Sequence, residues 1–211
     1  MGDEMVEASR FWDKMAERYV ASPIADVPTY ERKLEITRGY LRPDMELLEV
    51  GCGSGATARL HAPYVKHILA TDFSSRMIDL ARAKSAEEGV TNVTYEVADV
   101  NTLDRPGSFD MVLALSVLHL MEDRDATIRA IHGLLKPGGL FVSSTACIGD
   151  FAGIFRVIGP IGRALGLLPI LNVMTHQELV ASMEGAGFTI EHDWRPGKGK
   201  AVFIVARKTA E

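Results

Sequence analysis

The stretch LLEVGCGSGATARL, residues 47–60, decides the fold. A short apolar run ends at Val50, and a turn with glycines at positions 51, 53 and 55 leads into a helical pattern. Glycines let the backbone turn tightly and bring a ligand close to main-chain amides and to the positive end of the next helix. The motif is weak evidence alone, because it also satisfies the dinucleotide pattern G-x-G-x-x-A and would serve plain helix–strand packing.

Short apolar runs alternate with helical patterns beyond this motif. Such alternation is typical of strand–helix units that build a parallel sheet, so we predict an α/β fold. Lys136–Gly139 should end one helix and turn the chain directly into a strand. The predicted strands are 47–50, 67–71, 93–97, 109–115 and 140–144, and the predicted helices between them are 56–64, 75–88 and 123–135.

The C-terminal part predicts one more helix and two further strands. Thr175 and Glu178 have the spacing of a capping box, which places a helix start there. Strands are expected at 188–192 and 201–206, and the short loop between them permits an antiparallel hairpin but not a parallel crossover. Two helices, near 8–20 and 29–41, precede the sheet. We therefore predict a single domain over 1–211, with a helical cap at 1–42 and an apolar insert at 146–174.

Composition restricts the function. The 211 residues include 23 basic and 28 acidic side chains, a formal charge of −5, so nucleic acid is a poor candidate substrate. Two cysteines, Cys52 and Cys147, are too few for a disulfide framework and suit a reducing cytoplasm. The acidic N-terminus lacks the apolar stretch of a signal peptide. Residues 151–171 are long enough to span a membrane, but Arg156 and Arg163 argue against it.

Carboxylates follow three successive strands. Glu49 lies at the end of the first, Asp72 stands 21 residues beyond Gly51, and Asp99 follows the third. The carboxyl ends of parallel strands meet at one edge, where ligands of open α/β sheets bind and a carboxylate can accept ribose hydroxyls. Each acid alone could be a solvated loop residue or a helix cap. Together they disfavour a pyrophosphate and suit a positively charged adenosine ligand, which favours S-adenosylmethionine (SAM) over NAD.

At this point the chain resembles the class I SAM-dependent methyltransferases, in particular the small-molecule branch of ubiquinone and menaquinone biosynthesis. The resemblance covers about residues 10–207 and is carried by LEVGCGSG at 48–55, TDFSSRMIDLAR at 71–82, VADV at 97–100, FDMVLALSVLHLMED at 109–123 and LKPGGLFVSS at 135–144. It implies a Rossmann-like, seven-stranded, mostly parallel sheet with a C-terminal antiparallel hairpin, helices on both faces and an N-terminal helical cap.

The resemblance also implies a cofactor site and S-adenosylhomocysteine (SAH) as product. Gly51 and Gly53 would face the amino-acid part of SAM with Glu49 below, and Asp72 would hold the ribose. Phe73 and Met77 would pack on the adenosine, and Asp99 and Val100 would contact the adenine. Tyr19 would reach the SAM carboxylate, and Ser116 would lie near the methyl group. Tyr19 could equally be an aromatic residue that packs the helix.

The acceptor side is less defined. His119, just after the fourth strand, is the best candidate for a general base, although it could also only pack or hydrogen-bond; His176 is a second candidate. Phe151 and Phe155, in the insert, could bind an apolar acceptor, form core, or belong to a segment that touches a membrane surface through 151–171. The Asn/Asp-Pro-Pro-Tyr motif that grips planar amino groups is missing after the fourth strand, and no metal is expected.

The expected activity is in-line methyl transfer to a small, apolar or aromatic acceptor by a cytoplasmic enzyme. Two other function classes stay open. A catalytically silent SAM-binding or partner-activating subunit would keep every cofactor residue, whereas an NAD(P)-dependent oxidoreductase would leave Glu49 and Asp99 unexplained. The acceptor atom and the oligomeric state do not follow from the sequence.

Overall fold

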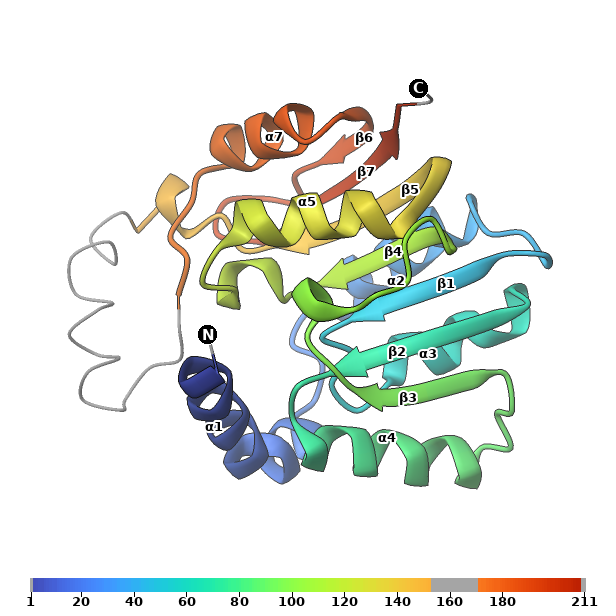
Figure 1. Cartoon of the computed structure of the whole chain (residues 1–211). Coiled ribbons are helices and arrows are strands. Elements are labelled where there is room, and N and C mark those ends of the chain that lie inside the picture. Colours follow the sequence, from blue (N-terminus) through green and yellow to red (C-terminus); the bar gives the residue numbers. More distant parts are fainter. Residues whose placement is uncertain (1, 153–170, 210–211) are drawn as a thin grey trace. The chain divides into compact units, whose positions relative to one another are not determined.

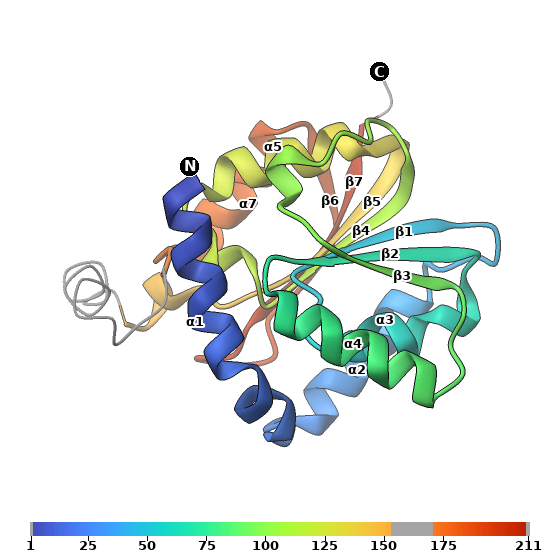
Figure 2. The ribbon, with the colours of Figure 1, turned by 60° about the horizontal axis from the view of Figure 1, so that its bottom comes forward.

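The computed structural model describes residues 2–152 and 171–209. These residues form a seven-stranded sheet in the order β3-β2-β1-β4-β5-β7-β6, with helices around it (Figures 1 and 2). The predicted fold class is therefore confirmed. Residues 1–102 and 103–211 each form a compact unit, and the single domain stays a prediction.

The first unit contains three parallel strands. They are β1 (Glu46–Val50), β2 (His67–Asp72) and β3 (Val93–Val97). Val50 pairs with Thr71, and Asp72 pairs with Val97, so the carboxyl ends of the three strands lie at one edge. Leu47, Leu48, Ile68, Leu69 and Ala70 are at most 2% exposed, which explains why these strands read as apolar runs.

Helices of the first unit begin at recognisable caps. Asp26 accepts from the Thr29 amide at the start of α2 (Val27–Arg38), and Ser74 accepts from the Met77 amide at the start of α4 (Ser75–Glu87). The helix predicted over 56–64 is shorter: α3 covers Ala56–His61, and a 3₁₀ turn, η1, covers Ala62–Tyr64. Pro63 cannot donate the next helical hydrogen bond, which accounts for the change. The other elements are α1 (Gly2–Ala21) and η2 (Val100–Thr102).

The second unit contains β4 (Phe109–Leu115), β5 (Leu135–Thr145), β6 (Phe188–Trp194) and β7 (Val202–Lys208). Strand β7 is antiparallel to both β5 and β6, which confirms the predicted hairpin. Helix α5 (Arg124–Leu134) packs against β5, and α7 (His176–Gly185) packs against β6. Thr175 and Glu178 form both bonds of the predicted capping box. The short turns are η3 (Leu118–Leu120) and η4 (Ile148–Asp150).

The prediction of a separate turn at Lys136–Gly139 was wrong. Strand β5 already begins at Leu135, which pairs with Phe109 before the register shifts at Met111. Gly138 has a φ of 72°, a conformation that favours glycine, so the Pro-Gly-Gly sequence makes an irregular strand start rather than a separate turn. The helix before it ends at Leu134 as a result.

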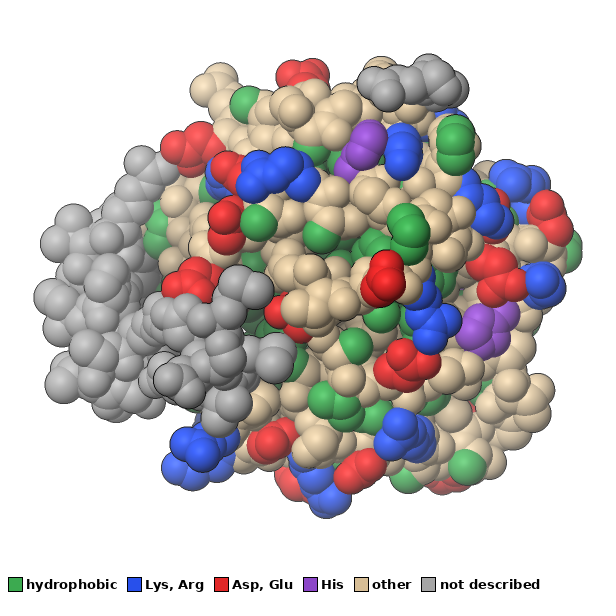
Figure 3. Space-filling model, in the orientation of Figure 1, with side chains coloured by type: hydrophobic (Ala, Val, Ile, Leu, Met, Phe, Trp, Pro, Cys, Tyr) green, Lys and Arg blue, Asp and Glu red, His purple; other side chains and the backbone are tan. Residues whose placement is uncertain are grey.

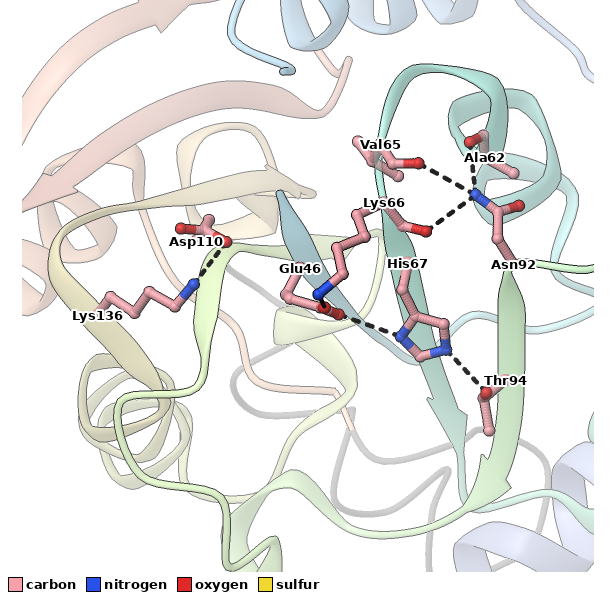
Figure 4. A network of polar contacts seen from close by, with 9 residues as sticks. All are labelled: Glu46, Ala62, Val65, Lys66, His67, Asn92, Thr94, Asp110 and Lys136. Atoms are coloured by element: carbon pink, nitrogen blue, oxygen red, sulfur yellow. Dashed lines mark hydrogen bonds and ion pairs between the residues drawn. The ribbon is translucent and has the colours of Figure 1, made fainter. Parts of the chain in front are cut away.

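Polar side chains at the amino ends of the strands pair with one another (Figure 4). In the first unit, Glu46 bridges Lys66 at 2.7 Å and His67 at 3.3 Å, and the His67 ring bonds to the Thr94 hydroxyl at 2.8 Å. The Asn92 amide donates to the carbonyls of Ala62, Val65 and Lys66. In the second unit, Lys136 bridges Asp110 at 2.8 Å. These groups satisfy each other, so they are structural.

The surface carries acidic and basic side chains interspersed on the face drawn in Figure 3. Exposed ion pairs of the chain, such as Lys84–Glu87, contribute little to stability. Within residues 2–152 and 171–209, no helix is long and apolar enough to cross a membrane. Cys52 and Cys147 are buried free thiols.

Candidate cofactor-binding site

The glycine turn adopts a backbone that glycine favours at three positions. The φ angles of Gly51, Gly53 and Gly55 are 64°, 52° and 70°. The Cys52 amide donates to the Thr71 carbonyl at 2.9 Å, which ties the turn to the end of β2. Helix α3 follows directly, and Gly55 has no side chain to cap it. The sequence motif thus forms the strand–turn–helix unit that it predicted.

Gly55 is also required by packing. A Cβ atom at this position would lie 2.6 Å from Cε1 and 2.7 Å from the hydroxyl oxygen of Tyr95. The Tyr95 ring is 5% exposed, and its hydroxyl bonds to the Ser85 hydroxyl at 2.8 Å. The third glycine therefore lets the turn approach β3. A Cβ atom at Gly53, by contrast, would lie 3.9 Å from Cε1 of Tyr19, an ordinary contact distance.

Asp72 is held by two main-chain amides. Its Oδ2 accepts from the Gly53 amide and its Oδ1 from the Ser74 amide, both at 2.9 Å. Burial raises the pKa of Asp72, the two amide bonds lower it, and the nearby Asp13 carboxylate raises it again. Asp72, the residue predicted to bind the ribose, is thus held by the glycine turn itself.

Glu49 lies below the turn and is 3% exposed. Burial raises its pKa to about 8; Arg59 and an amide bond from Ala58 oppose the rise, and Asp72 adds to it. Its Oε2 atom has no hydrogen-bond partner among the residues that the structure describes. A buried carboxyl group with an unpaired oxygen is costly unless a ligand completes it, and a positively charged group is the natural complement.

Helix α1 contributes an aromatic residue to the turn. The Tyr19 ring is 53% exposed, beside Gly53, and it contacts Trp12 edge to face at 5.9 Å. The buried part of the Tyr19 side chain, together with Asp72 and Tyr30, raises the pKa of its phenol, which therefore stays protonated and can donate a hydrogen bond. The position fits the predicted contact with the SAM carboxylate, which stays a prediction.

The predicted adenosine contacts also lie at the carboxyl ends of β2 and β3. Met77 is 2% exposed and Val100 is 3% exposed, whereas Phe73 and Asp99 are half-buried. Asp99 Oδ1 accepts from the amide of Asn101 at 2.9 Å, so it also caps η2. The Ala98 amide donates to the Asp72 carbonyl at 3.1 Å, which joins the end of β3 to the end of β2. Their contacts with adenosine remain predictions.

In the second unit, Ser116 and His119 follow β4. Ser116 has a φ of 61°, unusual for a residue other than glycine, and its amide donates to the Ser144 carbonyl at 2.7 Å. Burial lowers the pKa of His119 to about 4, so its ring is neutral at physiological pH. Within the described ranges the His119 Nδ1 has no hydrogen-bond partner, and its carbonyl accepts from the Asn172 amide at 2.7 Å.

His176 differs from His119 because its ring is paired. Nε2 lies 2.7 Å from Asp193 Oδ2, and the His176 amide donates to Asp150 at 3.2 Å. It is the first residue of α7, and its role as a second candidate base stays a prediction. Phe151 is 45% exposed. Phe155, Arg156, Arg163 and most of the stretch predicted to touch a membrane lie outside the described residues.

The two ends of the insert meet in the second unit. The Gly149 amide donates to the Met174 carbonyl at 2.8 Å, and a Cβ atom at Gly149 would lie 2.8 Å from the Met174 carbonyl carbon. Glycine is therefore required there for contact between two backbones.

Sequence reasoning missed residues that support the site. Asp13 of α1 accepts from the Ser74 hydroxyl at 2.6 Å, and Arg59 donates to the Ser54 carbonyl at 2.6 Å. Ser74 could have been recognised, because a serine directly before a helical pattern is a cap signal. Asp13 carries no such signal, since its partner is 61 residues away. No group of three or more His, Cys, Asp and Glu side chains that could hold a metal occurs in the described part of the chain.

Comparison with known proteins agrees with this geometry. Residues 48–143 match the family model of a methyltransferase domain. A ubiquinone biosynthesis O-methyltransferase of Xanthomonas axonopodis pv. citri is 32% identical over 191 residues, which cover 87% of this chain and 77% of that protein. The chain therefore belongs to the class I SAM-dependent methyltransferases, and SAM is its cofactor.

Solved structures show the same fold. A SAM-dependent methyltransferase of Mesorhizobium loti aligns with a TM-score of 0.69 at 24% identity, over 83% of this chain and 96% of that one. The [4+2]-cyclase SpnF aligns with a TM-score of 0.73 at 19% identity, over 85% of this chain and 81% of that one. At these identities the likeness concerns the fold alone, since one fold carries many reactions.

Proposed function

We propose that this methyltransferase transfers the methyl group of SAM to the oxygen of a small, apolar aromatic hydroxyl compound. One observation carries the proposal. The first unit gathers Glu49 and Asp72 at its glycine turn, and burial raises the pKa of both. A sulfonium or an ammonium group beside these buried carboxyl groups would stabilise their ionised form, whereas a pyrophosphate would oppose it, which favours a methyl donor over a dinucleotide.

Oxygen as the acceptor atom rests on two supports. The sequence after β4 is Ser116-Val117-Leu118-His119, without the motif that grips planar amino groups. The relative from Xanthomonas axonopodis is named an O-methyltransferase of ubiquinone biosynthesis, and it aligns over most of its length. The apolar composition of the insert, from Phe151 onward, suits an aromatic ring.

The reaction is an in-line displacement. A lone pair of the acceptor oxygen forms the new bond to the methyl carbon while the carbon–sulfur bond breaks and the sulfur keeps its electron pair. Holding the reactants in line supplies about 7–11 kcal/mol, so alignment is the main task of the protein. The hydroxyl proton goes to a base, and the neutral ring of His119 is our candidate for accepting it.

Binding and turnover measurements test the proposal in two steps. Isothermal titration with SAM, SAH and NAD should show binding of the first two only. Methyl transfer is then measured against phenols, quinols, carboxylates, thiols and amines, and we expect turnover with phenols or quinols. Transfer to amines or thiols alone would refute oxygen as the acceptor atom, and SAM binding without any turnover would favour a catalytically silent subunit.

The role of His119 is tested separately. His119→Gln should lower kcat by about 100-fold, within the range of general-base catalysis, and leave the Kd of SAH unchanged. His67→Gln is the matched control, because the His67 ring belongs to the structural network at the amino ends of the strands. An unchanged kcat in His119→Gln would show that the ring only packs.

A further inference from the structure

Helix α1 is anchored to the loop that follows β2. The Ser74 hydroxyl donates to Asp13 Oδ1 at 2.6 Å, and the Arg76 amide donates to the same oxygen at 3.1 Å. Glu17, one turn further along α1, pairs with the Arg76 guanidinium. Both ribbon views show α1 beside the start of α4, and the two helices are in contact (Figures 1 and 2).

Helix α4 does not need Asp13 as a cap. The Ser74 hydroxyl oxygen already accepts from the Met77 amide at 3.1 Å, which is the ordinary local cap. Asp13 adds a second, distant acceptor at the same helix end. Because Ser74 is fully buried, its hydroxyl hydrogen needs a protein acceptor, and Asp13 supplies it.

Ser74 also connects the Asp13 contact to Asp72, the residue predicted to bind the ribose. Its amide donates to Asp72 Oδ1 at 2.9 Å, and Asp72 Oδ2 accepts from the Gly53 amide at 2.9 Å. A continuous series of hydrogen bonds thus runs from α1 through Ser74 and Asp72 into the glycine turn. Ser74 itself bonds to Asp13 through its hydroxyl and to Asp72 through its main-chain amide.

The anchor places like charges together. The Asp13 carboxylate raises the pKa of Asp72, because two acids lie in one corner of the unit. Tyr19, on the same helix, has its ring beside Gly53. Docking of α1 therefore adds negative charge and an aromatic ring to the cofactor site, an arrangement that a positively charged ligand relieves.

We propose that Asp13 is a positioning residue that couples the docking of α1 to the orientation of the Asp72 carboxylate, so that α1 docking and cofactor binding strengthen each other. Coupling between two equilibria is reciprocal, so SAH should hold α1 in place as much as docked α1 holds SAH. The proposal rests on SAM as the cofactor and is independent of the acceptor.

Two readouts test it on the full chain. Titration calorimetry gives the Kd of SAH, and hydrogen exchange of residues 9–21 is measured with and without SAH. Asp13→Ala should raise the Kd about tenfold, the effect of losing a hydrogen bond to a charged group, and abolish the protection of α1 by SAH. Asp13→Asn keeps a carbonyl acceptor and should restore most of that protection.

Glu17→Ala is the matched control, because it removes another acid of α1 that reaches the same loop through an exposed ion pair. Its Kd should change less than twofold. An Asp13→Ala protein that binds SAH as tightly as the wild type, or a wild type whose α1 exchanges equally with and without SAH, would overturn this proposal alone. A wild type that does not bind SAH would refute the cofactor itself.

Discussion

Gly55 offers a quantitative test of how the cofactor turn is built. Gly55 and Gly89 both have a φ of 70°, yet a Cβ atom at Gly89 would meet nothing within 4 Å, whereas one at Gly55 would lie 2.6 Å from the Tyr95 ring. Gly89→Ala therefore measures the backbone cost alone, about 1–2 kcal/mol. Gly55→Ala adds overpacking of about 1–3 kcal/mol against a buried ring, for a total of about 2–5 kcal/mol.

The free energy of unfolding is measured by urea denaturation of both variants. For a chain of this size each kcal/mol lowers Tm by about 2–4 °C, so thermal scans give a second estimate. In a Tyr95→Ala background the cost of Gly55→Ala should fall to that of Gly89→Ala, because the ring no longer blocks the methyl group. Equal losses for the two alanine variants in the wild-type background would refute the packing argument.

Three further predictions concern buried or strained groups. Burial raises the pKa of Glu49 to about 8, so this group costs stability increasingly as pH rises from about 4.5 to 8. By denaturation, Glu49→Gln should therefore be at least about 1 kcal/mol more stable than the wild type at pH 8. By calorimetry, the same change should weaken the binding of SAM more than the binding of SAH. Burial and Arg38 lower the pKa of His61 to about 4, and neither ring nitrogen has a partner in the described residues. Stability should therefore fall as pH drops below about 6.5. Between pH 7 and pH 5, His61→Leu should lose about 2 kcal/mol less stability than the wild type, and an equal loss in both proteins would contradict this. Ser116→Gly should raise the free energy of unfolding by up to about 1 kcal/mol, because glycine accepts the φ of 61° without strain, whereas a loss would show that the hydroxyl compensates.

The sequence predicted those parts of the fold that depend on local patterns. Apolar runs such as 67–71 and the Thr175–Glu178 box carry their structure in neighbouring residues, so β2 and α7 begin at the predicted residues. The error at Lys136–Gly139 has a non-local cause. Leu135 pairs with Phe109 and Leu140 with Met111, so residues 136–139 lie in the register shift between these pairs, and a Pro-Gly-Gly sequence gives no sign of a partner strand.

The same distinction applies to the site. Glycine spacing and the acid near the end of each strand are enough to predict that Glu49, Asp72 and Asp99 lie at one edge, because parallel strands share their direction. The anchor from Asp13 to Ser74 depends on how α1 returns to α4, a contact between residues 61 positions apart. The pKa of Glu49 likewise depends on complete burial, which the sequence alone does not give.

The bond between Gly149 and Met174 has a consequence for engineering and for divergence within the family. Just inside these two positions, Asp150 accepts from His176 and Arg195, and the Asn172 amide donates to the His119 carbonyl, so the contacts at both ends should be kept in any exchange. Chimeras that exchange residues between these positions with those of relatives should therefore keep glycine at 149 and its bond to Met174, because a side chain there would collide with the Met174 backbone.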